Sequence, residues 1–415
     1  KLSKMRKVDE SLPLRPAREE LELDRPVIPE MEFLERQEKV RRKMKEEGFD
    51  LLILYADDGA VFGQEHARWL FNYQPHFEPA CILVPVEGEP VLLTGVESEE
   101  YIYASSYCNN VKVVDEFVYD AHEFPFSEIV SLDDQIKEII HGMSRKLTKV
   151  GVVGSNRITN RLYSRLATII EKEKMIPADE LMYELRAVKS ENEIKVLEFA
   201  YYIAQKGTEA AIEAIAVGKT EREVAAEAEY VMRKLGAEGF GIDTFVASGK
   251  IHNYPIIART TFKEIQNNEL ILLTIAPRYE GYHGAIGRPV VVGNVSQEIE
   301  NAIKVAIEAQ NAAKEMLKPG IAGNEADDAA RRIVEEAGLL KHYVYTGIHS
   351  IGVSEFEPPS LNNLYTKPLQ KDMVFSIDIP LFFNSWGGFR YEDGFHITEG
   401  GARPLQTLTT EIIRI

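Results

Sequence analysis

A carboxylate within an apolar segment is the sharpest chemical signal in the sequence. Asp378 interrupts residues 373–383, which otherwise carry mainly apolar side chains. Burying an ionised carboxylate costs several kcal/mol unless a partner or a ligand meets it. Asp378 is therefore predicted to belong to a functional site or, in the simpler alternative, to form a buried ion pair with Arg390 or Arg288.

Two histidines near glycines could supply acid–base chemistry. His252 follows a Ser-Gly turn, and a loop histidine suits general acid–base catalysis because its ordinary pKa lies near neutrality. His349 lies between two glycines that allow the backbone to approach a ligand closely. Each histidine could equally be a turn or surface residue, and Glu392 could be a solvated edge charge. The other polar candidates are Tyr282, His283 and the segments 355–359 and 390–393.

The motifs of several other enzyme classes are absent from the sequence. It has no Walker loop, no Gly-x-Ser-x-Gly elbow, no Cys-x-x-Cys pair and no His-Glu-x-x-His helix. Its short glycine runs also lack a dinucleotide fingerprint. No cofactor is therefore expected.

The composition is that of an acidic globular protein. The 415 residues include 48 Lys and Arg against 66 Asp and Glu, so the formal net charge is −18. A surface this acidic repels phosphate backbones and anionic lipids, which argues against nucleic acid and membranes as partners. The two cysteines fit a reducing compartment. No apolar run approaches the roughly 18 residues that span a bilayer, and a cytoplasmic protein with a small-molecule substrate is expected.

Three parts are predicted along the chain. Residues 1–28 are charged and punctuated by proline, which suggests an arm. Residues 29–182 alternate short apolar runs with helical spacing, a pattern typical of an α/β domain. Residues 183–415 form a second domain, opened by a helix over 191–216 that Ser190 and Glu193 would cap. In the first domain, strands are expected at 50–55, 80–85, 90–93 and 150–153, and helices at 31–47, 132–147 and 157–171.

The second half contains an internal repeat. Residues 218–236 and 320–338 match at one constant offset in their glycines and their apolar positions. Each copy is preceded by a longer helix and followed by an apolar strand, expected at 270–275 and 373–379. Two copies are too few for a solenoid. A pseudo-twofold is predicted to place these two strands side by side, unless the likeness reflects only two amphipathic helices of the same period.

With these motifs in place, residues 185–415 resemble the creatinase/aminopeptidase P/prolidase superfamily. The resemblance rests on the repeat helices and on residues 188–194, 245–249, 318–320 and 388–393. It implies a C-terminal pita-bread domain of α+β type with a pseudo-twofold repeat. Residues 30–180 resemble the family's N-terminal creatinase-type α/β domain more weakly. The resemblance also implies a homodimer.

The metal ligands of the family's peptidases are only partly kept. By resemblance, two aspartates fall on Thr274 and Ala285, a histidine falls on His349, and two glutamates fall on Asp378 and Glu392. Alanine cannot bridge two ions, so no two-metal site is expected. One ion on His349, Asp378 and Glu392 remains possible, since three protein ligands plus water can suffice.

The residues around His252 resemble those of creatinase, a member of the superfamily that works without metal. This resemblance implies metal-independent hydrolysis of a C–N bond with His252 as acid and base, while Asp378 and Glu392 position water or attack directly. Creatine itself is not implied, because the residue that grips its guanidinium falls on Gly287 and a partner-subunit arginine falls on Glu78. Glu78 would favour a positively charged ligand group or, alternatively, pair with a cation at a dimer contact.

The preferred interpretation is therefore a homodimeric, metal-independent hydrolase of a small non-peptide C–N bond, of the creatinase or ectoine-hydrolase kind. One alternative is a divergent Xaa-Pro aminopeptidase or dipeptidase with one metal ion. The other is a protein that binds a small ligand without turnover. The predicted catalytic residues are His252, His349, Asp378 and Glu392, and the predicted substrate-binding residues are Glu78, Tyr282, His283, Glu357 and Arg288.

Overall fold

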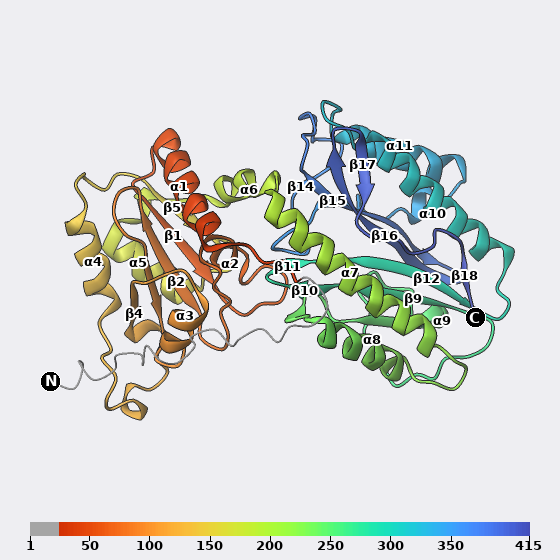
Figure 1. The fold of residues 1–415 in the computed structure, drawn as a ribbon, viewed down its shortest axis with the longest axis horizontal. Helices are drawn as coiled ribbons and strands as arrows, with labels where there is room; N and C mark the ends of the chain where they lie inside the picture. The colour runs from red at the N-terminus through yellow and green to blue at the C-terminus, as the bar shows by residue number, and fades with distance from the viewer. Residues whose placement is uncertain (1–24) are drawn as a thin grey trace. The chain divides into compact units, whose positions relative to one another are not determined.

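A computed structural model describes residues 25–415, so the predicted arm over residues 1–28 lies almost wholly outside the described part of the chain. Contacts between Cα atoms divide the chain after Leu185 into two compact units (Figure 1). The division falls within α6 (Asp179–Ala187). The boundary suggested by the sequence, after residue 182, falls within the same helix. The predicted α/β first half and α+β second half are confirmed.

The first unit is built on a six-stranded mixed sheet. Its strands are β1 (Leu51–Ala56), β2 (Ala80–Pro85), β3 (Val91–Thr94), β4 (Val111–Val113), β5 (Val150–Val153) and β6 (Met175–Pro177), and its helices are α1 (Glu30–Glu47), α2 (Glu65–Phe71), α3 (Glu99–Ser105), α4 (Leu132–Gly142) and α5 (Asn160–Ile170). The strand order is β4-β3-β2-β1-β5-β6. Apolar residues of α4 and α5 at helical spacing, such as Leu162 and Leu166, share one core with Leu51 and Ile53 of β1.

Capping chemistry explains where two of these helices differ from the sequence prediction. α4 ends at Gly142, five residues early, because glycine is the poorest helix former after proline. α5 begins at Asn160 rather than at residue 157, because the Thr159 side chain accepts a hydrogen bond from the Leu162 backbone N–H.

Two helix pairs flank the sheet of the second unit. They are α7 (Glu191–Ala214) with α8 (Glu221–Leu235), and α10 (Gln297–Met316) with α11 (Asn324–Glu336). The predicted capping box at Ser190 and Glu193 is confirmed, and Thr220 forms a second one with Glu223 at the start of α8. α8 ends at Leu235 and is capped by Gly236, whose φ of 115° is left-handed.

The sheet of the second unit contains the repeat. Its main strands are β8 (Phe245–Ser248), β9 (Glu269–Ile275), β12 (Ile286–Val292), β13 (Ile348–Ser350), β14 (Glu357–Ser360), β15 (Val374–Asn384) and β16 (Gly387–Thr398). Their order is β14-β13-β15-β16-β12-β9-β8, so β8, β9 and β12 have counterparts in β13, β15 and β16. The repeat is confirmed, but the prediction that β9 and β15 lie side by side is wrong. In each copy the chain reverses direction after β9 or β15 and forms one more strand. These two further strands, β12 and β16, lie next to each other at the centre of the sheet.

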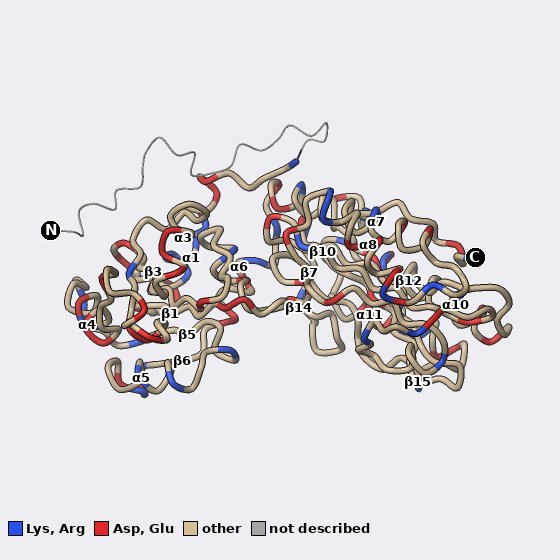
Figure 2. Tube along the Cα trace, turned by 90° about the horizontal axis from the view of Figure 1, so that it is seen from below, with Lys and Arg blue, Asp and Glu red and all other residues tan. Residues whose placement is uncertain are grey.

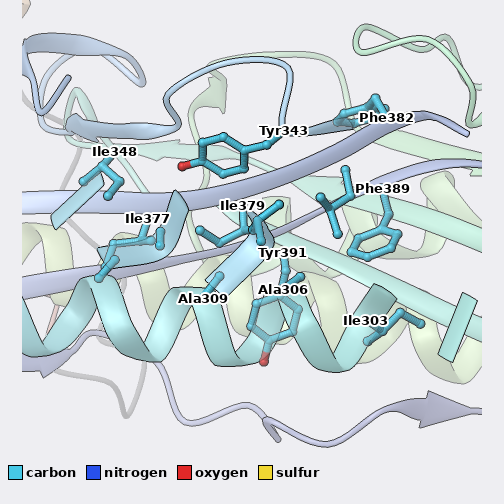
Figure 3. Close-up of a cluster of buried hydrophobic side chains, with 14 of the residues drawn as sticks. Ile303, Ala306, Ala309, Tyr343, Ile348, Ile377, Ile379, Phe382, Phe389 and Tyr391 are labelled. Carbon is cyan, nitrogen blue, oxygen red and sulfur yellow. The ribbon is translucent and has the colours of Figure 1, made fainter. Parts of the chain in front are cut away.

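Small residues allow α10 to lie close against this sheet. Figure 3 shows Ala306 and Ala309 on the helix beneath Ile377 and Ile379 of β15. These residues belong to a single buried cluster that also includes aromatic rings of β16, such as Tyr391. The close packing holds β15 and β16, which carry the charged candidates, in one rigid arrangement.

Charge is distributed along both units. Figure 2 shows acidic and basic positions interspersed on the helices and loops of each unit. None of the helices within residues 25–415 is long and apolar enough to cross a membrane.

Candidate active site

The centre of the second sheet places residues from four strands in one row. Asp378 lies directly opposite Glu392, Glu392 opposite Gly287, and Gly287 opposite Thr274. Directly opposed residues of antiparallel strands point to the same face, with Cβ atoms about 4.5–5.5 Å apart. A Cβ at Gly287 would lie 2.7 Å from Arg390 Cγ and 3.0 Å from Glu392 Cβ, so glycine leaves room for these two side chains. The sheet thus brings Asp378 and Glu392 together, at 5% and 2% exposure.

His349 is carried to this row by β13. Its Nδ1 lies 3.0 Å from the carbonyl oxygen of Ser350. Since a carbonyl oxygen only accepts, Nδ1 carries the proton and Nε2 keeps a free lone pair. On the neighbouring strand, Ser376 pairs with His349 in register and its hydroxyl donates to Glu392 Oε1 at 2.7 Å. The Phe356 ring lies against the imidazole, with 4.4 Å between ring centroids.

Glu355 joins the two predicted residues. One donor atom from each of His349, Glu355 and Glu392 lies within 4.8 Å of the other two. Burial raises the pKa of Glu355 to about 8, the Glu392 charge adds to the shift, and Arg390 opposes it. A second carboxyl is therefore forced against the buried Glu392, an arrangement that calls for a cation.

Asp378 is held by a tyrosine and an arginine. Its Oδ2 accepts a hydrogen bond from the Tyr345 hydroxyl at 2.5 Å and lies 3.9 Å from Arg390 Nε. Its Oδ1 is buried without a hydrogen-bond partner. Burial raises the pKa of Asp378 to about 7, against the Arg390 charge and with the help of Glu392. Of the two ion-pair partners that the sequence offered, Arg390 is the one beside Asp378.

The donor set fits one divalent cation and does not fit two. One imidazole and two carboxylates form a three-ligand site that leaves positions open for water and substrate. The positions where the resemblance puts further aspartates carry Thr274 and Ala285, which are 1% and 0% exposed. The Thr274 hydroxyl oxygen has no hydrogen-bond partner. Neither a neutral hydroxyl nor a methyl group can bridge two ions.

His252 belongs to a different group of residues. Its Nδ1 lies 3.0 Å from Oε1 of Glu221, a residue of α8 that is 0% exposed. Burial opposes ionisation, but hydrogen bonds from Ser248 and Thr261 lower the pKa of Glu221. Among the interactions of residues 25–415, none joins His252 to the row around Glu392.

Replacing His252 by alanine tests whether this residue acts as the general acid–base group or only supports the structure around Glu221. A general acid–base histidine contributes about 10²–10⁴-fold to the rate. Since the contacts of His252 tie it to Glu221 and Thr261, we expect kcat/KM of the His252→Ala variant to fall by less than about 10-fold. Steady-state kinetics with the variant, after circular dichroism confirms its fold, measures this loss. A loss of 10²-fold or more would restore His252 to the catalytic group.

Glu357 lies in a buried ion triad. It is 1% exposed and forms ion pairs with Arg186 and with Lys189, whose Nζ lies 2.8 Å from Glu357 Oε1. Burial opposes ionisation, but the Arg186 and Lys189 charges lower the pKa of Glu357 to about 2. These contacts are those of a structural ion triad, and a substrate-binding role for Glu357 stays a prediction.

The remaining substrate-binding candidates also have protein partners. Arg288 pairs with Asp393 at 2.7 Å, and the Tyr282 hydroxyl donates to a glutamate of α7 at 2.7 Å. His283 is fully buried, and a Cβ added at Gly241 would lie 2.8 Å from both its Cδ2 and the Glu355 Cβ. In the first unit, Glu78 is 8% exposed and accepts a hydrogen bond from the Ser98 backbone N–H at 2.8 Å. Their roles toward a substrate stay predictions.

Sequence reasoning assigned no role to Glu355 or Tyr345, and it named Arg390 only as an ion-pair partner for Asp378. Glu355 and Arg390 fall inside segments that were singled out, but nothing in their local sequence shows that the segment after β13 and strand β16 bring them to Glu392. Tyr345 carries no local signal, because its contact with Asp378 joins residues 33 positions apart.

Comparisons with known proteins point to peptidases. Residues 195–399 match the model of Metallopeptidase family M24, and residues 36–188 match that of the Creatinase/Prolidase N-terminal domain. The Xaa-Pro dipeptidases of Pyrococcus horikoshii and Pyrococcus furiosus are each 30% identical over 79% of this chain, which covers 89% and 90% of their lengths. The solved prolidase of Pyrococcus horikoshii superposes with a TM-score of 0.77 at 26% identity, over 91% of this chain and 100% of its own.

These findings correct the expected function. The expectation of a metal-independent hydrolase of a non-peptide C–N bond is wrong, because the matching family is one of metallopeptidases and the relatives are named Xaa-Pro dipeptidases. The coarser expectation of a hydrolase is confirmed, whereas a creatinase-like activity is not supported. The residues around His252 resemble those of the metal-free member, whereas His349 and Glu392 keep two of the family's metal-ligand positions.

Proposed function

Because the chain belongs to the metallopeptidase M24 family, we propose that it is a divergent Xaa-Pro peptidase that works with one divalent metal ion. The observation that carries the proposal is the cluster of His349, Glu355 and Glu392, whose donor atoms lie within 4.8 Å of one another. The specificity for a bond before proline rests on the names of the two Pyrococcus relatives.

The chain's own residues are arranged to hold such an ion. When bound, a divalent ion polarises a scissile carbonyl and lowers the pKa of water. His349 would offer Nε2, because its Nδ1 proton is used on the Ser350 carbonyl, and Glu392 would offer a carboxylate oriented by the Ser376 hydroxyl. A further carboxylate of the cluster would complete the set.

The charge of the cluster favours a substrate with a free N-terminus. Glu355, Asp378 and Glu392 bring three carboxyl groups close to the guanidinium of Arg390. An α-ammonium group would be attracted to these carboxylates, whereas an internal stretch of peptide would place a neutral amide there. This attraction supports the proposal that the substrates are short peptides from which the N-terminal residue is removed.

A metal-reconstitution assay tests the proposal. Chelator-treated full-length protein is assayed with Leu-Pro, Leu-Ala and N-acetyl-Leu-Pro, without metal and with Mn²⁺, Co²⁺ or Zn²⁺. We expect turnover only with added metal, a preference for Leu-Pro over Leu-Ala of at least about 10-fold, and no cleavage of the acetylated peptide. No cleavage of any dipeptide with any of the three metals would overturn the proposal, as would activity that the chelator does not affect.

A further inference from the structure

Glu355 is an unusual carboxylate in this cluster. Among residues 25–415 it has no hydrogen bond and no ion pair, whereas Glu392 accepts from Ser376 and Asp378 accepts from Tyr345. Its side chain is only partly exposed, and its carboxylate lies within 4.8 Å of donor atoms of His349 and Glu392. A partly exposed carboxylate that lies this close to His349 and Glu392 and makes no hydrogen bond is available to a ligand of the cluster.

Asp378 is engaged differently. The set of donors within 4.8 Å of one another does not include it. Its Oδ2 accepts the hydrogen bond from Tyr345 and faces Arg390. Its Oδ1 is buried without a hydrogen-bond partner, although Asp378 lies directly opposite Glu392 in the sheet. This second, independent observation shows that the row still lacks a group able to satisfy buried oxygens.

The two positions where the resemblance places the family's aspartates cannot hold a second ion. Thr274 and Ala285 contribute a hydroxyl and a methyl group where bridging carboxylates would be needed. The Arg390 side chain lies against Gly287, where an added Cβ would be 2.7 Å from its Cγ, and its buried guanidinium beside Asp378 already places a positive charge in the row. A second divalent cation would meet this charge without added anionic ligands.

We propose that Glu355 is the third protein ligand of a single divalent ion, together with His349 Nε2 and Glu392, and that the protein binds one ion per chain. The inference rests on the metal dependence in the proposed function, but it concerns which residues hold the ion and how many ions there are. One imidazole and two carboxylates suit divalent cations such as Mn²⁺, Co²⁺ and Zn²⁺.

Binding of Mn²⁺ tests the assignment without any substrate. Isothermal titration of metal-free full-length protein with Mn²⁺ is expected to give one site per chain. Glu355→Gln keeps the side-chain size but removes the charge, and should weaken Mn²⁺ binding by at least about 10-fold, the smaller loss known for residues that only support ligands. Asp378→Asn should weaken it less than Glu355→Gln, and Glu336→Gln, on an exposed helix face, should not change it.

Four results of these titrations would overturn the inference. Two sites per chain, no Mn²⁺ binding by the unmodified protein, unchanged affinity in Glu355→Gln, or a larger loss in Asp378→Asn than in Glu355→Gln would each do so. Circular dichroism of every variant confirms that the fold is kept. A protein that binds one Mn²⁺ through Glu355 but cleaves no dipeptide would overturn the proposed function alone, and a metal-dependent dipeptidase indifferent to Glu355→Gln would overturn this inference alone.

Discussion

Replacing Glu392 by glutamine is expected to lower kcat/KM for Leu-Pro by about 10²–10³-fold, the loss typical of removing one strong electrostatic contact from an active site. Glu392 lies at the centre of the row, opposite both Asp378 and Gly287, and belongs to the set of three metal donors. Glutamine keeps the oxygen that accepts from the Ser376 hydroxyl, so the local packing is preserved while the negative charge is lost.

Steady-state kinetics with saturating Mn²⁺ measures the effect of Glu392→Gln. Glu336→Gln is the matched control, because it makes the same chemical change on the exposed face of α11. The control should keep the unmodified rate. If Glu392→Gln kept more than about a tenth of the activity, a loss far below the range above, the row on β15 and β16 would not be the active site.

Replacing Glu357 by glutamine is expected to destabilise the second unit by about 3–5 kcal/mol, the usual cost of removing one partner from a buried ion pair. Arg186 and Lys189, whose side chains are 2% and 1% exposed, would then lose the carboxylate charge that they share. Urea unfolding followed by tryptophan fluorescence measures the change. A Trp69→Phe background leaves Trp386, in the second unit, as the fluorescent reporter.

The same variant gives a pH signature. The pKa of Glu357 is about 2 in the folded protein against an ordinary value of 4.5, so the folded state binds this proton more weakly than the unfolded state. The stabilisation that the ionised Glu357 carboxylate gives to the folded protein is therefore complete above about pH 4.5 and is lost as the pH falls through about 2. The stability difference between the unmodified protein and Glu357→Gln should be constant from pH 7 to 5 and shrink below pH 4.5. A difference that stayed constant down to pH 2.5 would show that the triad is not the cause.

Much of the fold could be predicted because it is written in local patterns. The strands at 80–85 and 150–153 agree with β2 and β5 residue for residue, since short apolar runs bounded by turns are typical of buried strands. The repeat was visible in the glycines and apolar spacing of two helices. The neighbours of β9 and β15 could not be predicted, because strand order depends on where each chain reversal places the next strand, and no local pattern encodes that.

The site could be predicted only where family positions or buried charge point to it. His349, Asp378 and Glu392 come together as expected, from β13, β15 and β16. His252 was singled out on a local likeness, but its contacts are with Glu221 and Thr261. The Glu355 contact depends on the backbone direction after β13, which a single sequence does not reveal.

The repeat of the second unit also has a consequence for how the protein can change. The two copies differ in what they contribute: His349, Glu355, Asp378 and Glu392 all lie on the later copy, while the earlier copy contributes Gly287 and Thr274 to the same row. Two like halves in one polypeptide can diverge separately. Substitutions in the earlier copy could therefore change the number of ions bound per chain, while the metal donors of the later copy stay the same.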